Sequence, residues 1–151
     1  MDRRMVGTAA GRRGMLGMTL IELMAVIMVI GVLGMIAIPS YRQYSMRAQR
    51  TEAKSALLQL QTNQERYYLT NRSYGTVAQL VAANLLPAGG LSERGVYAIT
   101  ITGANANGYT ATATPTSGGA IDMSLDAQCT TFTINAQGVR SATGTTAATC
   151  W

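Results

Sequence analysis

The stretch GMTLIELMAVIMVIGVLGMIAIP, residues 17–39, sets the architecture of this chain. Its apolar run, residues 18–38, matches the roughly 20 residues that a helix needs to cross the hydrocarbon of a membrane. Within the run stands Glu22, and a carboxylate in lipid costs roughly 3 kcal/mol on insertion scales. Such a charge indicates a function, so the sequence should also supply a positive partner for it.

Outside this run the composition is that of a small polar domain. Charged residues make up 13% of the 151 residues, below the usual ~25%, and the apolar excess lies near the start. The formal charge is +5, but residues 1–17 alone contain four arginines and Asp2. Without them eight basic and six acidic side chains remain, near +2, so charge argues only weakly for nucleic acid or an acidic membrane.

Two ordinary explanations of the apolar run fit poorly. A secretory signal would end in a small-residue cleavage site, but this run ends Ala37-Ile38-Pro39-Ser40, and the small residue at a cleavable junction is Gly17, before the run. An ordinary signal anchor would have no reason to carry Glu22 near its start. Lysine and arginine do not orient the span, because similar numbers precede and follow it.

The motif Gly17-Met18 followed by TLIEL, with Pro39, Tyr41 and Tyr44 downstream, resembles the type IV pilins over roughly the first fifty residues. One departure is Met18, where that family usually has Phe. The strings AKSAL at 53–57 and ERYY at 65–68, with the ending Cys150-Trp151, look most like minor pilins of the PilE kind.

The resemblance implies that a prepilin peptidase cuts between Gly17 and Met18 on the cytoplasmic face and that the new amine is N-methylated. That amine is the positive partner of Glu22, since a buried carboxylate beside an opposite charge stays ionised. Glu22 then sets subunit register in a filament, and the amine belongs to a neighbour or to the same chain. The resemblance also assigns Thr19 and Pro39 to assembly.

We therefore predict four segments. They are a leader (1–17), a transmembrane and filament-core helix (18–38), an amphipathic half of the same helix (39–70), and a head (71–151) with a connecting loop, a β-sheet and a C-terminal disulfide loop. Gly31, Gly34 and Pro39 predict a stretch of the helix that can kink or melt.

The head is predicted to be an α+β roll, in which a long helix packs on a small antiparallel sheet. Helical spacing puts one apolar face of the helix on the sheet, consisting of Ala53, Ala56, Leu57, Leu60, Gln64 and Tyr67. After a connecting segment with one short helical turn within 77–86, alternation predicts strands near 96–102, 109–114, 130–135 and 139–142. The turn of the first hairpin is expected at 103–108.

Cys129 and Cys150 are the two cysteines, and the chain has no histidine. Two thiols alone make a poor zinc site, so an exported domain favours a disulfide worth ~3 kcal/mol. Two free buried thiols are the alternative and require a reducing compartment.

Charged and aromatic clusters receive structural interpretations. We expect Arg47, Arg50 and Lys54 to form a solvated stripe, with contact to an acidic neighbouring subunit as the alternative. Asp122 and Asp126 are interpreted as solvated loop acids rather than an ion site. Three tyrosines and two arginines at 66–74 are expected to pack on the head rather than stack on nucleic acid.

No enzyme, cofactor or metal is expected, because histidine-based catalysis and a phosphate-loop lysine are missing from the sequence. The expected function is a structural type IV pilus subunit, minor in the sense of low abundance, that serves adhesion, twitching motility or pilus biogenesis. Its expected partners are other pilin subunits, prepilin peptidase, the assembly machinery and the inner membrane. The head would be periplasmic before assembly and extracellular in the pilus.

Two alternatives remain. One is a pseudopilin of a type II secretion system. The other is a DNA-receptor pilin for competence, which ranks lower because only Arg72, Arg94 and Arg140 follow the helix, so no nucleic acid partner is expected.

Overall fold

The structure is a computed structural model that describes residues 19–117 and 122–151. The predicted cleavage junction Gly17-Met18 lies outside these residues. The chain divides into two units, of which one ends at Ile38 and the other runs from Pro39 to Trp151.

Helix α1 runs from Leu20 to Asn71 and passes through both units. At its start the hydroxyl of Thr19 accepts a hydrogen bond from the backbone N–H of Glu22 at 3.3 Å. A threonine followed three residues later by glutamate is the pattern of a helix N-cap. The predicted weak stretch around Gly31, Gly34 and Pro39 is helical throughout in this structure.

In the first unit almost every side chain of α1 is exposed. Its most apolar window of 18 residues has a mean hydropathy of 2.7, and none of that window is buried. By length and composition this section can cross a membrane.

In the second unit α1 packs on a sheet through the face that its spacing predicts. Ala53, Leu57, Leu60 and Gln64 are buried, and Ala56 and Tyr67 pack partly buried against the same core. The polar side chain on this face is satisfied, because the amide of Gln64 both donates to Gly75 O at 2.7 Å and accepts from Gly75 N at 2.8 Å. The predicted amphipathic face is therefore confirmed.

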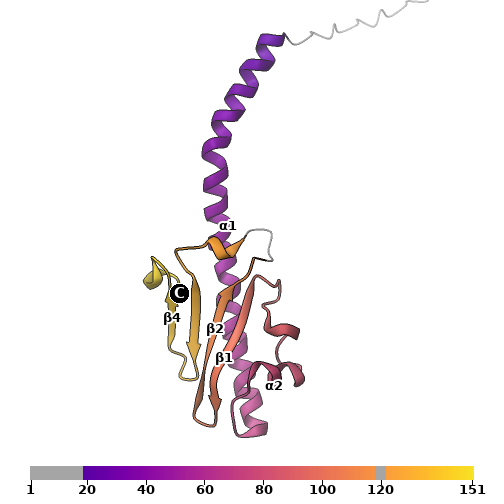
Figure 1. Cartoon of the computed structure of the whole chain (residues 1–151), viewed down its shortest axis with the longest axis vertical. Coiled ribbons are helices and arrows are strands. Elements are labelled where there is room, and N and C mark those ends of the chain that lie inside the picture. Colours follow the sequence, from indigo (N-terminus) through magenta and orange to yellow (C-terminus); the bar gives the residue numbers. More distant parts are fainter. Residues whose placement is uncertain (1–18, 118–121) are drawn as a thin grey trace, which may run out of the picture. The chain divides into compact units, whose positions relative to one another are not determined.

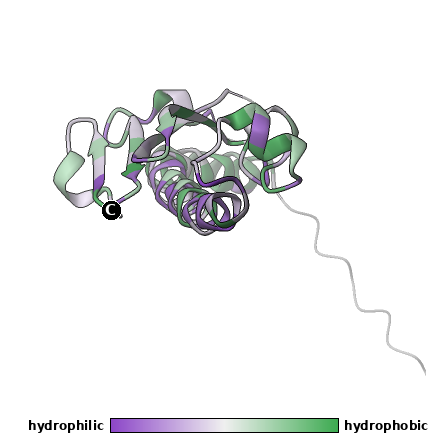
Figure 2. Cartoon of the chain, turned by 90° about the horizontal axis from the view of Figure 1, so that it is seen from below, coloured by the Kyte–Doolittle hydropathy of each residue, from purple (hydrophilic) through white to green (hydrophobic). Residues whose placement is uncertain are grey.

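The sheet is an antiparallel meander in the order β1-β2-β3-β4. Its strands are β1 (Tyr97–Asn105), β2 (Gly108–Pro115), β3 (Thr131–Asn135) and β4 (Arg140–Thr143). Figure 1 shows these strands beside α1, and the view along the helix in Figure 2 shows the sheet as a second layer on one side of it. The α+β fold expected from the sequence is the observed one.

Alternation along the strands separates a core face from an outer face. The buried positions are Tyr97, Ile99, Tyr109, Ala111, Ala113, Phe132 and Ile134. The register brings core residues together, as in Ala113 opposite Phe132, while threonines pair on the outer face, as in Thr100 opposite Thr112. Strand alternation thus fixes which side chains reach α1.

The first hairpin differs from the prediction in its turn. β1 continues to Asn105, so the turn is only Ala106-Asn107, rather than residues 103–108. A register irregularity between Thr102 and Asn105 absorbs Gly103, whose φ of 63° is left-handed. A bulge of this kind keeps pairing beyond a glycine that the sequence alone presents as a turn.

Short helices close the remaining connections. α2 (Val77–Ala82) lies in the predicted connecting segment and starts with a capping box formed by Thr76 and Gln79. Single 3₁₀ turns follow at η1 (Ala88–Gly90), η2 (Met123–Leu125) and η3 (Ala147–Thr149).

Candidate functional site

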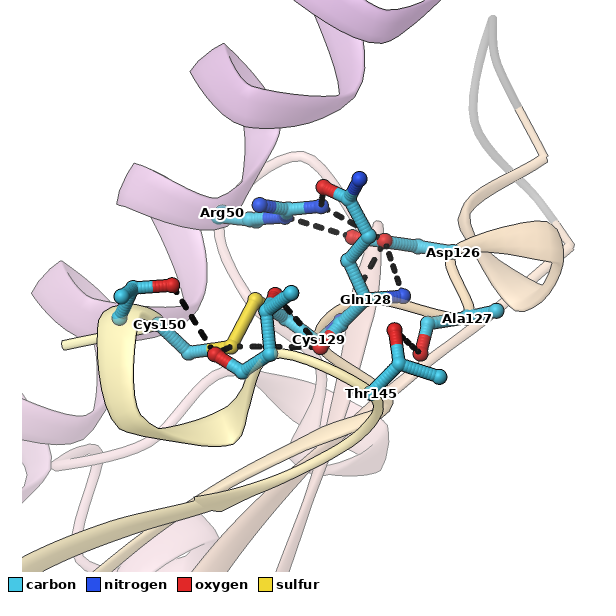
Figure 3. A network of polar contacts seen from close by, with 9 residues as sticks. Arg50, Asp126, Ala127, Gln128, Cys129, Thr145 and Cys150 are labelled. Atoms are coloured by element: carbon cyan, nitrogen blue, oxygen red, sulfur yellow. Dashed lines mark hydrogen bonds and ion pairs between the residues drawn. A yellow bond between two sulfur atoms is a disulfide. The ribbon is translucent and has the colours of Figure 1, made fainter.

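A disulfide between Cys129 and Cys150 closes the last part of the head. This is the pairing that the sequence favours for an exported domain, and both cysteines are buried. We call residues 126–130 and 143–150 the disulfide loop. Figure 3 shows that the loop lies beside α1.

Arg50 and Asp126 join α1 to this loop through an ion pair. The Arg50 Nε donates to Asp126 Oδ2 at 2.7 Å, and Nη2 donates to Oδ1 at 2.7 Å and to Gln128 Oε1 at 3.0 Å (Figure 3). The Asp126 side chain is only 2% exposed. A carboxylate that meets a guanidinium at two atoms forms one of the stronger and more directional contacts in proteins.

This pair corrects two expectations from the sequence. Charge patterning predicts a solvated Arg50 and a solvated loop acid at Asp126, and both predictions are wrong. The two side chains are largely removed from water, and Asp126 also accepts from Gln128 N at 3.1 Å and thereby holds the turn that precedes Cys129. Asp122 has a different task, since its carboxylate caps η2 by accepting from Ser124 N at 2.9 Å.

Backbone hydrogen bonds hold the two halves of the disulfide loop together. Thr145 N donates to Ala127 O at 3.0 Å, and Thr146 N donates to Gln128 O at 3.2 Å. Gly144, with φ of 132°, makes this approach possible, because a Cβ there would collide with Gln128 O. The loop is thus fixed by a covalent bond, an ion pair and a backbone ladder.

Trp151 follows the loop and packs on the sheet. Its Nε1 donates to Ser141 O at 2.6 Å, and its ring meets that of Phe132 edge-on with centroids 6.0 Å apart. The Arg140 Cζ lies 5.4 Å from the Trp151 ring centroid, within the range of a cation–π contact.

The other two members of the predicted basic stripe have no such partner. Within residues 19–117 and 122–151, neither Arg47 nor Lys54 has a carboxylate oxygen within 4.0 Å. In the basic stripe, Arg50 is therefore neutralised by Asp126, whereas Arg47 and Lys54 remain available to an anion.

Glu52 makes a second polar anchor on another side of α1. Its carboxylate accepts from the Ser92 hydroxyl at 2.6 Å, from Arg94 N at 3.0 Å and from Arg94 Nε at 2.8 Å. Burial opposes ionisation, but these hydrogen bonds and the guanidinium outweigh it, so the pKa of Glu52 lies below its ordinary value. The sequence does not predict this role of Glu52, because its one signal is an acid beside the apolar face of the helix.

The tyrosines pack within the head. The Tyr74 ring lies between Tyr68, with centroids 4.8 Å apart, and Tyr109, with centroids 5.0 Å apart. The Tyr74 hydroxyl donates to Glu65 at 3.1 Å. These rings are engaged with one another, which suits packing better than stacking on bases.

The chain is similar to a known protein family and to a solved structure. A family model described as "Type IV minor pilin ComP, DNA uptake sequence receptor" matches residues 39–133. The crystal structure of the Neisseria meningitidis non-core minor pilin PilV is similar, with 22% sequence identity, coverage of 68% of this chain and 90% of that chain, and a TM-score of 0.48. A search of curated proteins found no match.

Proposed function

Because the chain belongs to the family of type IV minor pilins that the ComP model describes, we propose that it is a membrane-anchored pilus subunit whose head binds DNA. Membership confirms the pilin resemblance of the sequence, and the chain is a minor type IV pilin rather than an enzyme. Minor pilins assemble with other pilin subunits in the pilus. A pseudopilin of a secretion system gains no support from this match.

The observation that carries the DNA-binding proposal is the extent of the family match. It begins at Pro39 and covers most of the head, and it leaves out the apolar segment. The head is therefore the part that resembles a DNA uptake sequence receptor. This reverses the order suggested by the sequence, in which a DNA receptor ranks below a purely structural subunit and no nucleic acid partner is expected.

The charge of the second unit, residues 39–151, is compatible with this proposal. It contains eight basic and five acidic side chains. A ranking based only on the three arginines after the helix underestimates this charge, because the part of α1 within this unit carries the other basic side chains. Two of the acids, Glu52 and Asp126, are engaged with arginines, so they offer little repulsion to a phosphate backbone.

Fluorescence anisotropy tests the DNA-binding proposal with the full chain in detergent and a labelled duplex. Binding should weaken steeply between about 50 and 200 mM salt, because phosphate contacts release counterions. No binding at about 50 mM salt would reject the proposal, since electrostatic attraction is strongest there.

The anchor proposal concerns processing and assembly. The exposed apolar section of α1 and the capped start at Thr19 and Glu22 support a helix that enters a membrane and later a filament core. We infer cleavage between Gly17 and Met18, methylation of Met18, and an inner-membrane stage before extraction by the assembly machinery. Mass spectrometry should find methylated Met18 as the first residue, and an intact leader or a cut near Ala37 would reject this part.

Glu22 has its own test within this proposal. Glu22→Ala should still be cleaved but should be poorly recovered in sheared pili, because the amine of Met18 loses its carboxylate partner. Normal recovery would remove the register role. The amount of this chain relative to the major subunit in the same preparation tests its minor status.

A further inference from the structure

A polar groove separates α1 from the disulfide loop. Its cavity of ≈ 400 Å³ is lined from the helix by Arg47, Arg50 and Lys54, and from the loop by Gln128, Thr146, Thr149 and Cys150. The three basic residues are spaced by three and four positions, so they lie on one face of the helix. The fold thus turns a basic stripe of the sequence into one wall of a groove.

The groove carries net positive charge. None of its lining residues is acidic, and Asp126, the acid that pairs with Arg50, is almost fully buried behind it. Arg47 is exposed and Lys54 is half-buried, and among the described residues no carboxylate lies within 4.0 Å of either. Two cations are therefore available to an anion from outside.

The opposite wall adds a neutral donor. Arg50 Nη2 occupies the amide oxygen of Gln128 at 3.0 Å, which leaves the amide NH₂ of that side chain as the group without a hydrogen bond in the described residues. An amide NH₂ can donate two hydrogen bonds. Arg50 and Asp126 therefore act as positioning residues that orient Gln128 and hold the loop at this distance from the helix.

The chemistry of the lining favours nucleic acid over protein as the occupant. Protein interfaces have a core enriched in apolar and aromatic side chains and depleted in charge. Every residue that lines this groove, apart from Cys150 of the disulfide, carries a charged, amide or hydroxyl group, and none is aromatic. Interfaces with DNA are more polar and much more positive.

We infer that this groove holds the phosphate backbone of double-stranded DNA, with Arg47 and Lys54 neutralising phosphates and the amide of Gln128 donating to a phosphate oxygen. The inference rests on the proposed DNA-binding function and assigns it a surface. Phosphate contacts position a duplex without reading its sequence, so this groove supplies affinity and register.

Two matched double variants test the groove with the full chain in detergent. Arg47→Gln/Lys54→Gln and Arg66→Gln/Arg72→Gln each remove two exposed or half-buried cations without breaking an ion pair. The groove variant should weaken duplex binding at least tenfold and lower the slope of log affinity against log salt by about 2, because two phosphates are no longer neutralised. The control should retain the slope of the wild type.

A third variant separates the groove from general charge. Gln128→Glu keeps an acceptor for Arg50 but replaces the free donor with a negative charge in the groove. It should melt like the wild type and bind duplex several-fold more weakly. Unchanged DNA binding by this variant, with an unchanged melting temperature, would overturn the inference.

The remaining outcomes are also decisive. If both double variants weaken binding equally, or if neither does, DNA binding persists as a function but this groove is not its site. If the groove variant binds DNA normally but is absent from pili, the occupant is an acidic neighbouring subunit. If the wild type binds no duplex, both the proposed DNA-binding function and the assignment of the groove are rejected.

Discussion

The guanidinium of Arg50 and the carboxylate of Asp126 are joined by two hydrogen bonds of 2.7 Å although 76 positions separate the residues in the chain. The arginine stands on α1, and the aspartate stands three residues before Cys129. Their pairing fixes the disulfide loop to the helix at its first half, while the Cys129–Cys150 bond fixes the second half to the first. The position of the groove therefore depends on both the ion pair and the disulfide.

Removing the charge of Asp126 should destabilise the head. Asp126→Asn leaves the Arg50 charge, with its side chain 13% exposed, without an anion, and the loss of one partner of a buried pair costs about 3 kcal/mol. Denaturant unfolding of the full chain, followed by near-ultraviolet circular dichroism, measures this cost. Asp122→Asn is the control, and it should cost well under about 1 kcal/mol, because asparagine keeps the oxygen that accepts from Ser124 N. Equal costs would contradict the structural role of the ion pair.

Removing the disulfide should release the loop. Cys129→Ala/Cys150→Ala opens a cross-link between residues 21 positions apart and should cost about 3 kcal/mol in the chain-entropy model. Trp151, the single tryptophan of the chain, reports the local change through its fluorescence. Its emission should shift to the red at denaturant concentrations where the wild type is still folded. If the emission of the variant and of the wild type shifted at the same denaturant concentration, the backbone hydrogen bonds would be sufficient to hold the C-terminal segment without the disulfide.

Gly144 should be the most sensitive glycine among the residues of the head that the structure describes. A Cβ at this position would collide with the backbone of Gln128 and Cys129, which the disulfide and the hydrogen bond from Thr146 N hold close to Gly144. Gly144→Ala should therefore unfold at lower denaturant than Gly95→Ala. Gly95 also has a left-handed φ, of 72°, but open space around it, so its substitution costs only the ~1–2 kcal/mol of backbone strain. Similar midpoints for the two variants would contradict the collision.

Periodicity explains what the sequence could predict. The buried face of α1 from Ala53 to Gln64 follows a helical period, and the core side chains of β1 and β3 follow a period of two, so local spacing alone identifies them. The ends of the strands are harder to predict from local spacing. The bulge before Asn105 extends β1 past Gly103, and pairing with β2 rather than local preference decides this.

The polar anchors could not be read from the sequence in the same way. Nothing periodic links Arg50 to Asp126 or Glu52 to Ser92, because these pairs form only when distant segments are brought together. Charge patterning suggests solvation for the basic stripe, which describes an isolated helix. Packing of the disulfide loop against one side of that helix buries Arg50 and leaves Arg47 and Lys54 facing a groove.

Acid should destabilise the head through Glu52. Its pKa is lower in the folded protein than the ordinary 4.5, so its contribution is fully present above that pH and is lost as the pH falls through the folded pKa. Glu52→Gln should lower the free energy of unfolding by about 1–3 kcal/mol at neutral pH, because the Ser92 and Arg94 donors lose a charged acceptor. It should also reduce the loss of stability that the wild type shows as the pH falls. Urea titrations from neutral pH downward measure both effects. Glu93→Gln, at an exposed position, should leave the neutral-pH stability unchanged.

Alkali should destabilise the head through buried tyrosine. The Tyr109 hydroxyl has no hydrogen-bond partner in the described residues, and burial, followed by the charges of Glu65 and Tyr74, raises the pKa of Tyr109 to about 12. In the unfolded chain a tyrosine ionises near pH 10. Stability is therefore complete below about pH 10 and falls by up to 1.36 kcal/mol per pH unit for this group until about pH 12.

Burial raises the pKa of Tyr97 as well, so Tyr109→Phe should remove only part of the alkaline loss while leaving neutral stability unchanged or slightly higher. Urea unfolding at a series of pH values from neutral to about 11 measures how much of the alkaline loss of stability each variant retains. In this range the buried tyrosines stay protonated in the folded protein while tyrosines in the unfolded chain ionise. Tyr44→Phe, at a position that is 74% exposed, should keep the full alkaline loss. If Tyr109→Phe also kept it, the alkaline sensitivity would lie with Tyr97 alone, and the buried, unpaired hydroxyl of Tyr109 would have no energetic consequence.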